Sequence, residues 1–369
     1  MGIQGIPDTM KAVQVVELHK PYQINTIPVP STLGPHDILV KTAVASLCHT
    51  DGMVSAGILG PGKLPQTASH EGTGTIAAIG SSVSSLHVGD RVMCGLPLHP
   101  CGSCADCTNP RGDIQYCPHI EGHVGVTADG AFADYVVADA RSTARLPDEV
   151  SFETAAPLAC AGSTVWRGIV QSGVEEGGWV GIVGAGGGLG HLGIQFAKAK
   201  GLRVVGVDAR EEGLELARKN GADVVVDARK GKEQVVKEVR EATGGEGVEA
   251  TVNVSDAEGA AGLSAAIARL HGLVLQIAQP NNVSIPFEEI VFRDIRIRGS
   301  LICSPKEAVE MLDAVAKYKI SVHTNPFYGL DKIHDLVELA HSGKMKGKGI
   351  IIVDEEQVKA ERKPGIELA

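Results

Sequence analysis

The sequence predicts an α/β protein with two domains, one mainly β and one built on a doubly wound parallel sheet. The chain has 369 residues, which at roughly 100–200 residues per domain indicates two domains. Its first part consists of short apolar or alternating runs, and after Trp179 such runs alternate with helical stretches. Glycine occurs 46 times and aromatic residues occupy only 4% of positions, so we expect a tightly wound, mostly aliphatic core.

The first 160 residues contain apolar or alternating runs that we interpret as strands. Glycine, proline or aspartate bounds each run, as is typical of strands joined by turns. The runs occupy residues 11–18, 37–44, 72–80 and 132–139. This part of the chain is therefore predicted to be mainly β.

From Trp179 onward the pattern indicates parallel strands connected by helices. Strands are expected at residues 179–185, 202–208, 222–227, 248–255 and 273–278. The stretches between them, expected to be helical, are 189–201, 211–221, 230–243 and 263–272. Parallel neighbours need such crossover helices. The charged tail from Asp354 is expected to be a frayed surface extension.

Charge and cysteine usage narrow the class of protein. The formal net charge is −10, which argues against nucleic acid or an anionic membrane as the main partner. We find no apolar run of membrane-spanning length and no signal peptide at the start, so a cytoplasmic protein with a small-molecule substrate is expected. Eight cysteines in such a protein favour metal binding over disulfides.

A glycine-rich loop follows the first strand of the parallel part. The loop contains Gly184, Gly186, Gly187, Gly188, Leu189 and Gly190. Such a loop lets the backbone approach a pyrophosphate, which then rests on the N-terminus of the next helix. Asp208 ends the following strand and is placed to bind the adenosine ribose, which favours NAD. Arg210 would suit a 2′-phosphate, so NADP remains open.

Four cysteines lie close together in one segment with the spacing C-x2-C-x2-C-x9-C. They are Cys101, Cys104, Cys107 and Cys117. Four thiolates complete a tetrahedral shell and leave no position for substrate, so the spacing predicts a structural zinc site. The last spacing is longer than is usual in the family named below, and His119 or His123 is the alternative fourth ligand.

A second set of possible metal ligands is dispersed along the chain. Cys48, His70 and Cys160 would form a Cys2His site with one open position, which is a known catalytic zinc arrangement. Asp51 and Glu71 lie beside them, where a carboxylate can orient a ligand. The spacing alone is weak evidence, because single cysteines and histidines are often part of a core.

Several motifs together resemble the zinc-dependent alcohol dehydrogenases of the medium-chain dehydrogenase/reductase superfamily, particularly their tetrameric yeast and fungal branch. The motifs are CHTD at 48–51, HEGTG at 70–74, GDRV at 89–92, the cysteine loop, CAGST at 160–164 and GAGGGLG at 184–190. The resemblance runs from about Met10 to Asp354. It implies a GroES-like catalytic domain, residues 1–160 and 308–369, and an inserted Rossmann coenzyme domain, residues 161–307.

The resemblance also implies a role for individual residues. Cys48, His70 and Cys160 match the catalytic zinc ligands, and Glu71 matches a residue that can transiently bind that zinc. Thr50 matches the hydroxyl that takes the alcohol proton, and Asp51 matches the acid that orients the ligating histidine. Contacts with the coenzyme are expected from His49, Thr164, Ala278 and Lys348. Two zinc ions per chain and a homotetramer are implied, with a dimer left open.

Two positions of the catalytic machinery depart from the family pattern. Met53 stands where the family has a histidine that relays the alcohol proton, so water or His49 must replace it. Gly213 stands where the family often has a lysine on the adenosine ribose. This second departure is another reason to leave NADP open.

The substrate pocket also departs from the ethanol-oxidising relatives. Leu59 and Leu96 stand where those enzymes have tryptophans, and Gln279 lies near an expected apolar position. These changes predict an alcohol or carbonyl substrate larger and more polar than ethanol, with a fungal biosynthetic (secondary-metabolite) pathway as one hypothesis.

Three alternative functions are kept. They are an ethanol-type alcohol dehydrogenase, a zinc-independent quinone reductase of the same fold, and a non-catalytic dinucleotide-binding protein.

Overall fold

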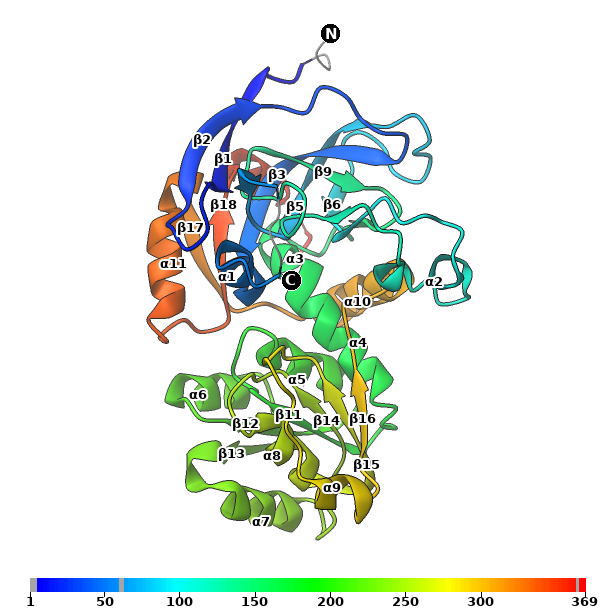
Figure 1. The fold of residues 1–369 in the computed structure, drawn as a ribbon, viewed down its shortest axis with the longest axis vertical. Coiled ribbons are helices and arrows are strands. Elements are labelled where there is room, and N and C mark those ends of the chain that lie inside the picture. The colour runs from blue at the N-terminus through cyan, green and yellow to red at the C-terminus, as the bar shows by residue number, and fades with distance from the viewer. Residues whose placement is uncertain (1–4, 60–62, 363–364) are drawn as a thin grey trace. The chain divides into compact units, whose positions relative to one another are not determined.

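The computed structural model describes residues 5–59, 63–362 and 365–369, and the chain divides into two compact units (Figure 1). One unit comprises Met1–Cys160 and Cys303–Ala369, and the other comprises Ala161–Ile302. Residues 303–307, expected in the inserted domain, thus belong to the first unit. The reason is local: Ser304 caps the helix α10 (Pro305–Tyr318) in a capping box with Glu307, and α10 contacts a strand of the first unit, β10 (Ala144–Arg145).

The first unit is mainly β, as the sequence predicts. A small sheet has the order β2-β1-β4, and a larger sheet has the order β10-β6-β5-β3-β18-β17 with β9 also paired to β3. The small sheet contains β1 (Thr9–Val15), β2 (Gln23–Pro28) and β4 (Gln66–Thr67). The larger contains β3 (Asp37–Leu47), β5 (Glu71–Ile79), β6 (Arg91–Met93), β9 (Tyr135–Asp139), β10 (Ala144–Arg145), β17 (Thr324–Tyr328) and β18 (Lys348–Ile352). A separate two-stranded antiparallel sheet pairs β7 (Pro97–Leu98) with β8 (Gly122–His123).

The large sheet is completed in its middle by a strand from the end of the chain. β18 runs antiparallel to β3, with Gly349 opposite Leu47 and Ile352 opposite Val44. Its other edge pairs in parallel with β17. Residues on either side of the inserted unit are therefore hydrogen-bonded neighbours.

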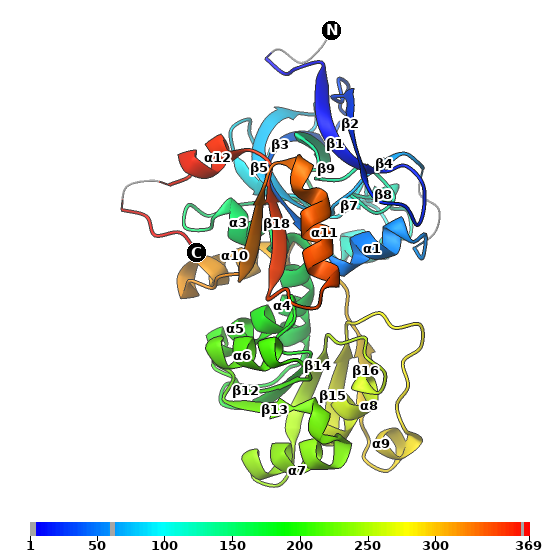
Figure 2. The same cartoon turned by 90° about the vertical axis from the view of Figure 1, so that its left-hand side faces the viewer.

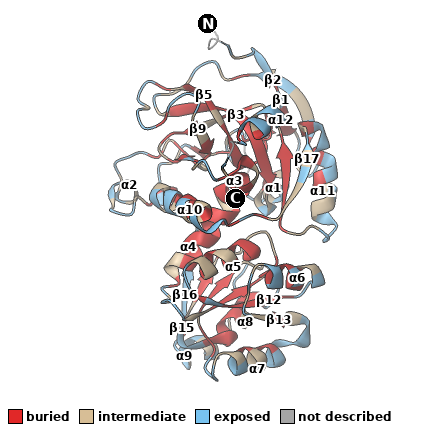
Figure 3. Ribbon diagram, turned by 180° about the vertical axis from the view of Figure 1, so that it is seen from behind, coloured by how far each residue is buried: buried red, intermediate tan, exposed pale blue. Residues whose placement is uncertain are grey.

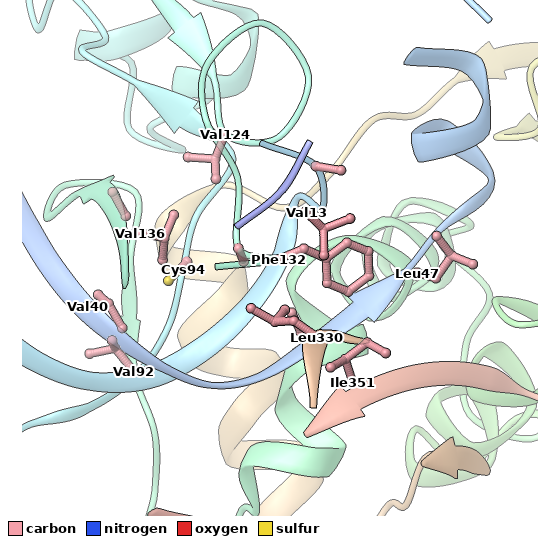
Figure 4. Packing of buried hydrophobic residues seen from close by; sticks show 14 of the residues in the cluster. Val13, Val40, Leu47, Val92, Cys94, Val124, Phe132, Val136, Leu330 and Ile351 are labelled. Carbon is pink, nitrogen blue, oxygen red and sulfur yellow. The ribbon is translucent and has the colours of Figure 1, made fainter. Parts of the chain in front are cut away.

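The core of the first unit forms around Phe132. This fully buried ring belongs to a cluster that also contains Val13, Leu47, Leu330 and Ile351, contributed by widely separated parts of the chain (Figure 4). Burying each such side chain contributes about 1.5–3 kcal/mol. The cluster thereby fixes both ends of the chain against the central strands.

Short helices surround these sheets, and the tail is ordered by one of them. The helices are α1 (His49–Ser55), α2 (Ala105–Thr108), α3 (Phe152–Pro157), α11 (Ile333–His341) and α12 (Glu355–Ala360), with 3-10 turns at Ile114–Tyr116 and Leu330–Lys332. Figure 2 shows α11 beside β18. The expectation of a frayed tail is wrong: Glu361 is buried and accepts hydrogen bonds from Phe152 N at 2.9 Å and Arg91 Nη2 at 2.5 Å. Among the described residues, no helix has the length and apolar character needed to cross a membrane.

The second unit contains the predicted parallel sheet. Its order is β13-β12-β11-β14-β15-β16, which is the Rossmann order. The strands are β11 (Trp179–Val183), β12 (Arg203–Asp208), β13 (Val224–Asp227), β14 (Val248–Asn253), β15 (Ala268–Gln276) and β16 (Arg296–Gly299). The helices are α4 (Ser163–Gln171), α5 (Gly190–Ala199), α6 (Glu211–Lys219), α7 (Lys232–Ala242), α8 (Ala260–Ile267) and α9 (Phe287–Val291). A 3-10 turn lies at Ala228–Lys230. Helices α4 to α6 pack beside one another, as do α7 to α9. Figure 3 shows that β12 is buried, whereas α7 and α9 carry many exposed residues.

One predicted helix of this unit ends early. The stretch 263–272 was expected to be helical, but α8 stops at Ile267 and β15 begins at Ala268. The guanidinium of Arg293 donates hydrogen bonds to the carbonyls of Ala265 and Ala266 at 3.1 and 3.3 Å. A side chain that satisfies the last free carbonyls of a helix stabilises its end at that point.

Candidate metal and coenzyme sites

Cys48, His70, Glu71 and Cys160 come together in the first unit. Each offers one possible ligand atom, and these atoms all lie within 4.8 Å of one another. Cys48 immediately precedes α1, Glu71 begins β5, and Cys160 lies in a π-helical turn, Leu158–Gly162. The structure thus brings together the residues that the sequence predicts as catalytic zinc ligands, although more than a hundred positions separate the first from the last.

Local hydrogen bonds hold two of these residues in place. Asp51, at the third position of α1, accepts a hydrogen bond from Cys48 N at 2.8 Å and so closes the first turn of the helix. Its other oxygen, Oδ1, lies 3.1 Å from Nδ1 of His70, and both side chains are fully buried. Asp51 therefore positions the cysteine and the histidine at the same time.

The cluster has the chemistry that a zinc ion requires. His70 Nε2 is buried and has no hydrogen-bond partner among the described residues, as expected of a nitrogen reserved for a metal. The contact with Cys160, followed by Lys348 and His70, lowers the pKa of the Cys48 thiol, although burial opposes them. Two sulfurs and one imidazole are donors that suit zinc. The residues present therefore fit the metal.

Lys348 lies in this cluster, where the sequence had not placed it. Its Nζ atom is 2.7 Å from Oε2 of Glu71, and the two side chains are 5% and 0% exposed. Burial raises the pKa of Glu71, and the neighbouring ammonium group opposes that rise. The resemblance predicts that Lys348 contacts the coenzyme pyrophosphate. In the structure the partner of Lys348 is the carboxylate of Glu71, and the contact with the coenzyme stays a prediction.

The four loop cysteines form a second cluster. The sulfurs of Cys101, Cys104, Cys107 and Cys117 lie within 4.8 Å of one another, and those of Cys101 and Cys117 are 3.6 Å apart. The long spacing before Cys117 contains a turn in which Asn109 Oδ1 accepts from Arg111 N at 2.8 Å and the 3-10 turn Ile114–Tyr116. Hydrogen bonds from Ser103 and Cys104 lower the pKa of Cys101 to about 5, which favours the thiolate that zinc binds.

The glycine-rich loop opens the helix α5 in the second unit. Gly184 has a φ of +90°, a conformation that side chains rarely adopt. A Cβ atom at Gly186 would overlap the backbone of Gly213, and one at Gly190 would overlap the Gly184 carbonyl. The close packing of strand, loop and helix that a dinucleotide site needs therefore depends on these glycines.

Asp208, the last residue of β12, lies beside the glycine-rich loop. Its carboxylate accepts hydrogen bonds from the backbone N–H groups of Gly186 at 2.9 Å, Ala209 at 2.9 Å and Arg210 at 3.0 Å. Nε of Arg210 lies 3.7 Å from Oδ1 of Asp208. Gly184, Gly187, Asp208 and Arg210 line one cavity of about 810 Å³. Four of the predicted coenzyme residues thus line one cavity, whereas Gly186, Gly188, Leu189 and Gly190 of the same loop are not among its lining residues.

The sequence missed other residues that line this cavity. They include Arg229, Lys232 and Ser255, each of which lies just beyond the C-terminal end of β13 or β14. In a parallel doubly wound sheet, ligands bind at these strand ends, so the position of each residue was a signal that could have found it. Arg229 is already paired with Asp227 at 2.7 Å and Glu211 at 3.0 Å.

The remaining predicted residues are divided between the two units. In the first, His49 and Thr50 form the first turn of α1, Leu59 is 39% exposed, and Leu96 is half-buried. In the second, Thr164 is buried in α4, Ala278 is half-buried and Gln279 is exposed. Gln276 Nε2 donates to the Ala278 carbonyl at 2.7 Å. The roles expected for these residues toward coenzyme and substrate stay predictions.

Two family models match the chain in the order in which its parts occur. Residues 34–148 match the alcohol dehydrogenase GroES-like domain, and residues 188–317 match the zinc-binding dehydrogenase domain. The first match covers His70 and the cysteine loop, and the second covers most of the parallel sheet. The domain types expected from the motifs are thereby confirmed.

Relatives from bacteria, fungi and archaea match nearly the whole chain. An alcohol dehydrogenase of Geobacillus stearothermophilus is 36% identical over 94% of this chain and 100% of its own length, and alcohol dehydrogenase 1 of Emericella nidulans is 34% identical over 94% and 99%. The solved alcohol dehydrogenase of the archaeon Aeropyrum pernix is 30% identical and superposes with a TM-score of 0.84 over 93% of this chain and 99% of that one. The yeast and fungal branch stays a prediction, because bacterial as well as fungal relatives match over nearly their whole length. The chain belongs to the zinc-binding alcohol dehydrogenase family, whose members combine a GroES-like domain with a Rossmann domain.

Proposed function

We propose that this protein transfers hydride between a nicotinamide coenzyme and an alcohol/carbonyl pair with the help of zinc. The observation that carries the proposal is the cluster that the half-buried Cys48 and Cys160 form with the buried His70, whose Nε2 has no hydrogen-bond partner among the described residues. Membership of the alcohol dehydrogenase family supports the same reaction. The cavity at Asp208 supports a dinucleotide as the second substrate.

The side chains of the cluster prepare a site with one position left for substrate. Zinc bound there supplies Lewis acidity, which polarises the oxygen of an alcohol or carbonyl. Asp51 Oδ1 fixes the proton of His70 on Nδ1, so that Nε2 presents its lone pair. The lowered pKa of Cys48 keeps its sulfur in the form that binds metal.

The alcohol proton must leave without the histidine that the family uses. Thr50 stands in the first turn of α1, two positions after Cys48, and we assign its hydroxyl the first transfer. Met53 cannot take the proton further, so His49 or water completes the path. Loss of a fixed relay base slows oxidation near neutral pH without abolishing it.

NAD is the coenzyme that Asp208 favours. A carboxylate at this strand end binds ribose hydroxyls and repels a 2′-phosphate. Arg210 lies close enough to shield part of that charge, so use of NADP is the alternative outcome. The second zinc, held by the four loop cysteines, is proposed to be structural, because four thiolates leave no open position.

The substrate is proposed to be larger and more polar than ethanol. Leu59 and Leu96 occupy less space than tryptophan, and a glutamine at position 279 would lose a hydrogen bond beside a purely alkyl substrate. Reduction of a carbonyl in a fungal secondary-metabolite pathway would suit such a substrate. An ethanol-type alcohol dehydrogenase is the alternative. A homotetramer in the cytoplasm is proposed from the resemblance alone.

Metal analysis combined with a substrate panel tests the proposal. We expect two zinc ions per chain and turnover of larger polar aldehydes or alcohols, measured with NADH and NADPH in parallel. Cys48→Ser and Cys160→Ser should each remove one zinc and abolish turnover, whereas Cys94→Ala, outside both clusters, should retain both zinc ions. The highest kcat/KM for ethanol would support the alternative substrate class.

Other results would change the class of protein. Fewer than two zinc ions in an active wild type would favour the quinone reductase. Binding of NADH without turnover of any substrate would favour the dinucleotide-binding protein. Wild-type rates in both serine variants would contradict zinc catalysis.

A further inference from the structure

The metal cluster contains one more donor than an open catalytic site can use. Besides Cys48, His70 and Cys160, an oxygen of Glu71 lies within the same 4.8 Å. Four protein donors complete a tetrahedral shell, as they do in structural zinc sites. For a substrate oxygen to reach the metal, the Glu71 carboxylate must be held away from it.

Lys348 is the residue placed to hold that carboxylate. Its Nζ atom lies 2.7 Å from Oε2 of Glu71, and both side chains are almost completely buried. A buried carboxylate has lost its hydration and needs a partner that compensates for this loss, such as a cation. The ammonium group of Lys348 is such a partner, and a bound metal ion would compete with it for the same carboxylate.

The position of the ammonium group follows from the sheet. Lys348 is the first residue of β18, its N–H donates to the carbonyl of His323 at 2.8 Å, and its own carbonyl accepts from Asn325 Nδ2 at 3.2 Å. The next residue, Gly349, pairs with Leu47, the neighbour of Cys48. The lysine therefore belongs to the same sheet as Glu71, and Cys48 directly follows a strand of that sheet.

We propose that Lys348 is a positioning residue that keeps Glu71 out of the coordination shell of the metal. The metal is then held by Cys48, His70 and Cys160, and its fourth position is available to substrate. The proposal rests on the proposed function, since it concerns the same metal site. It gives Lys348 a task within the first unit that needs no contact with the coenzyme.

Replacing the lysine by an uncharged side chain of similar length tests this assignment. In Lys348→Met, Glu71 loses its cation and binds the metal, so we expect chelator-driven zinc release from this site to slow by about tenfold, with a similar loss in kcat. In the cobalt-substituted variant, the visible absorption should change because an oxygen ligand has been added. Release from the four-cysteine site serves as an internal reference that should not change.

A second substitution makes the test specific to Glu71. In the double variant Lys348→Met/Glu71→Gln, the new ligand is removed, so the zinc release rate and the cobalt spectrum should return toward those of the wild type. Lys348→Arg, which preserves the positive charge, should behave like the wild type in both measurements. Lys344→Met, an exposed lysine four residues earlier, is the matched control and should change nothing.

Several outcomes would overturn the assignment. Unchanged zinc release and cobalt spectra in Lys348→Met would show that Lys348 does not control Glu71, and a raised Kd for NADH alone would return the lysine to the coenzyme pyrophosphate. Loss of zinc from both clusters with a lowered Tm would show a purely structural role. A wild type that holds no zinc at this site would instead contradict the proposed function, so the two failures are distinguishable.

Discussion

Gly213 lies against the carboxyl group of Asp208: a Cβ atom added at position 213 would come within 2.5 Å of the Cγ atom of Asp208. Gly213 is in the first turn of α6, and Asp208 ends β12. Any side chain at 213, including the lysine common in the family, would displace this carboxylate. The glycine at position 213, where the family often has a lysine, is therefore the condition for the present position of Asp208.

Gly213→Ala should impair coenzyme binding without affecting the metal. Alanine favours a helix over glycine by up to about 1 kcal/mol, but here it would push Asp208 away from the N–H groups of Gly186 and Arg210. We expect the Kd for NADH, measured by fluorescence titration, to rise about tenfold with full zinc content. Gly299→Ala, where a Cβ meets no atom within 4 Å, is the control; equal binding in both variants would contradict the role of position 213.

Replacement of Asp208 should change the preference between the two coenzymes. Asp208→Ser removes the charge that repels a 2′-phosphate and leaves Arg210, now 3.7 Å from that carboxylate, free to pair with the phosphate. The ratio of kcat/KM for NADPH to that for NADH should rise at least about tenfold, equivalent to about 1.4 kcal/mol. Adding Arg210→Met should reverse the gain; if it does not, another cation of the cavity, such as Arg229, binds the phosphate.

Cys117 should be the fourth ligand of the structural zinc site despite its long spacing. Cys117→Ser should lower the zinc content by one ion per chain and lower the Tm, because a structural zinc contributes its binding free energy to folding. Zinc analysis and calorimetry measure the two effects. His119→Ala and His123→Ala should retain the ion, and loss of zinc in either of them with retention in Cys117→Ser would identify a histidine as the ligand.

Asp139 should stabilise the first unit in a pH-dependent way. Its buried carboxylate accepts from Arg141 Nη2 at 2.6 Å and Nε at 2.9 Å and from His99 N at 3.0 Å. Burial alone would raise the pKa of Asp139, but these hydrogen bonds outweigh it and lower the pKa below its ordinary value. Because the pKa is lower in the folded state, the stabilisation is present above the unfolded pKa of about 3.9 and is lost as the pH falls through the folded value.

Urea unfolding of Asp139→Asn measures this effect. At pH 7.5 we expect the variant to lose about 2 kcal/mol relative to the wild type. The difference should remain constant down to about pH 4.5 and shrink only below the unfolded pKa of about 3.9. A difference that already shrinks between pH 7 and 6 would indicate that His99, bonded to Asp37 at 2.6 Å, is the group that titrates.

The parts of the site that depend on short-range pattern could be predicted from the sequence. The turn from Cys48 to Asp51 closes on itself through a hydrogen bond three residues apart, and the glycine loop lies between one strand and the next helix. In each case the types of the residues and the spacing between them determine the local backbone conformation. For the same reason the parallel strands and most of their helices lie where the alternating pattern indicates.

The features that were missed depend on contacts between distant residues. Lys348 meets Glu71 only because β18 pairs with β3 in one register, and no local pattern reports that register. Likewise, Arg293 ends α8 from 25 or more positions away, overriding the helical preference of the residues that follow. Glu361 is buried because Arg91, 270 residues earlier, supplies its partner.

The insertion of one unit within the other has a consequence for synthesis on the ribosome. The second unit is one continuous stretch, Ala161–Ile302, and can fold as soon as it has emerged, because domains generally fold as units during translation. The first unit cannot close its large sheet until β18 arrives to pair with β3, some 300 residues after β3 was made. Until then the edge of β3 that will pair with β18 is exposed, and an exposed strand edge can pair with another chain and aggregate. The carboxylate of Glu71 also lacks its partner, the ammonium group of Lys348. While the second unit is being synthesised, the nascent chain is therefore most in need of a chaperone. During the same interval nothing yet holds the Glu71 carboxylate away from the metal ligands.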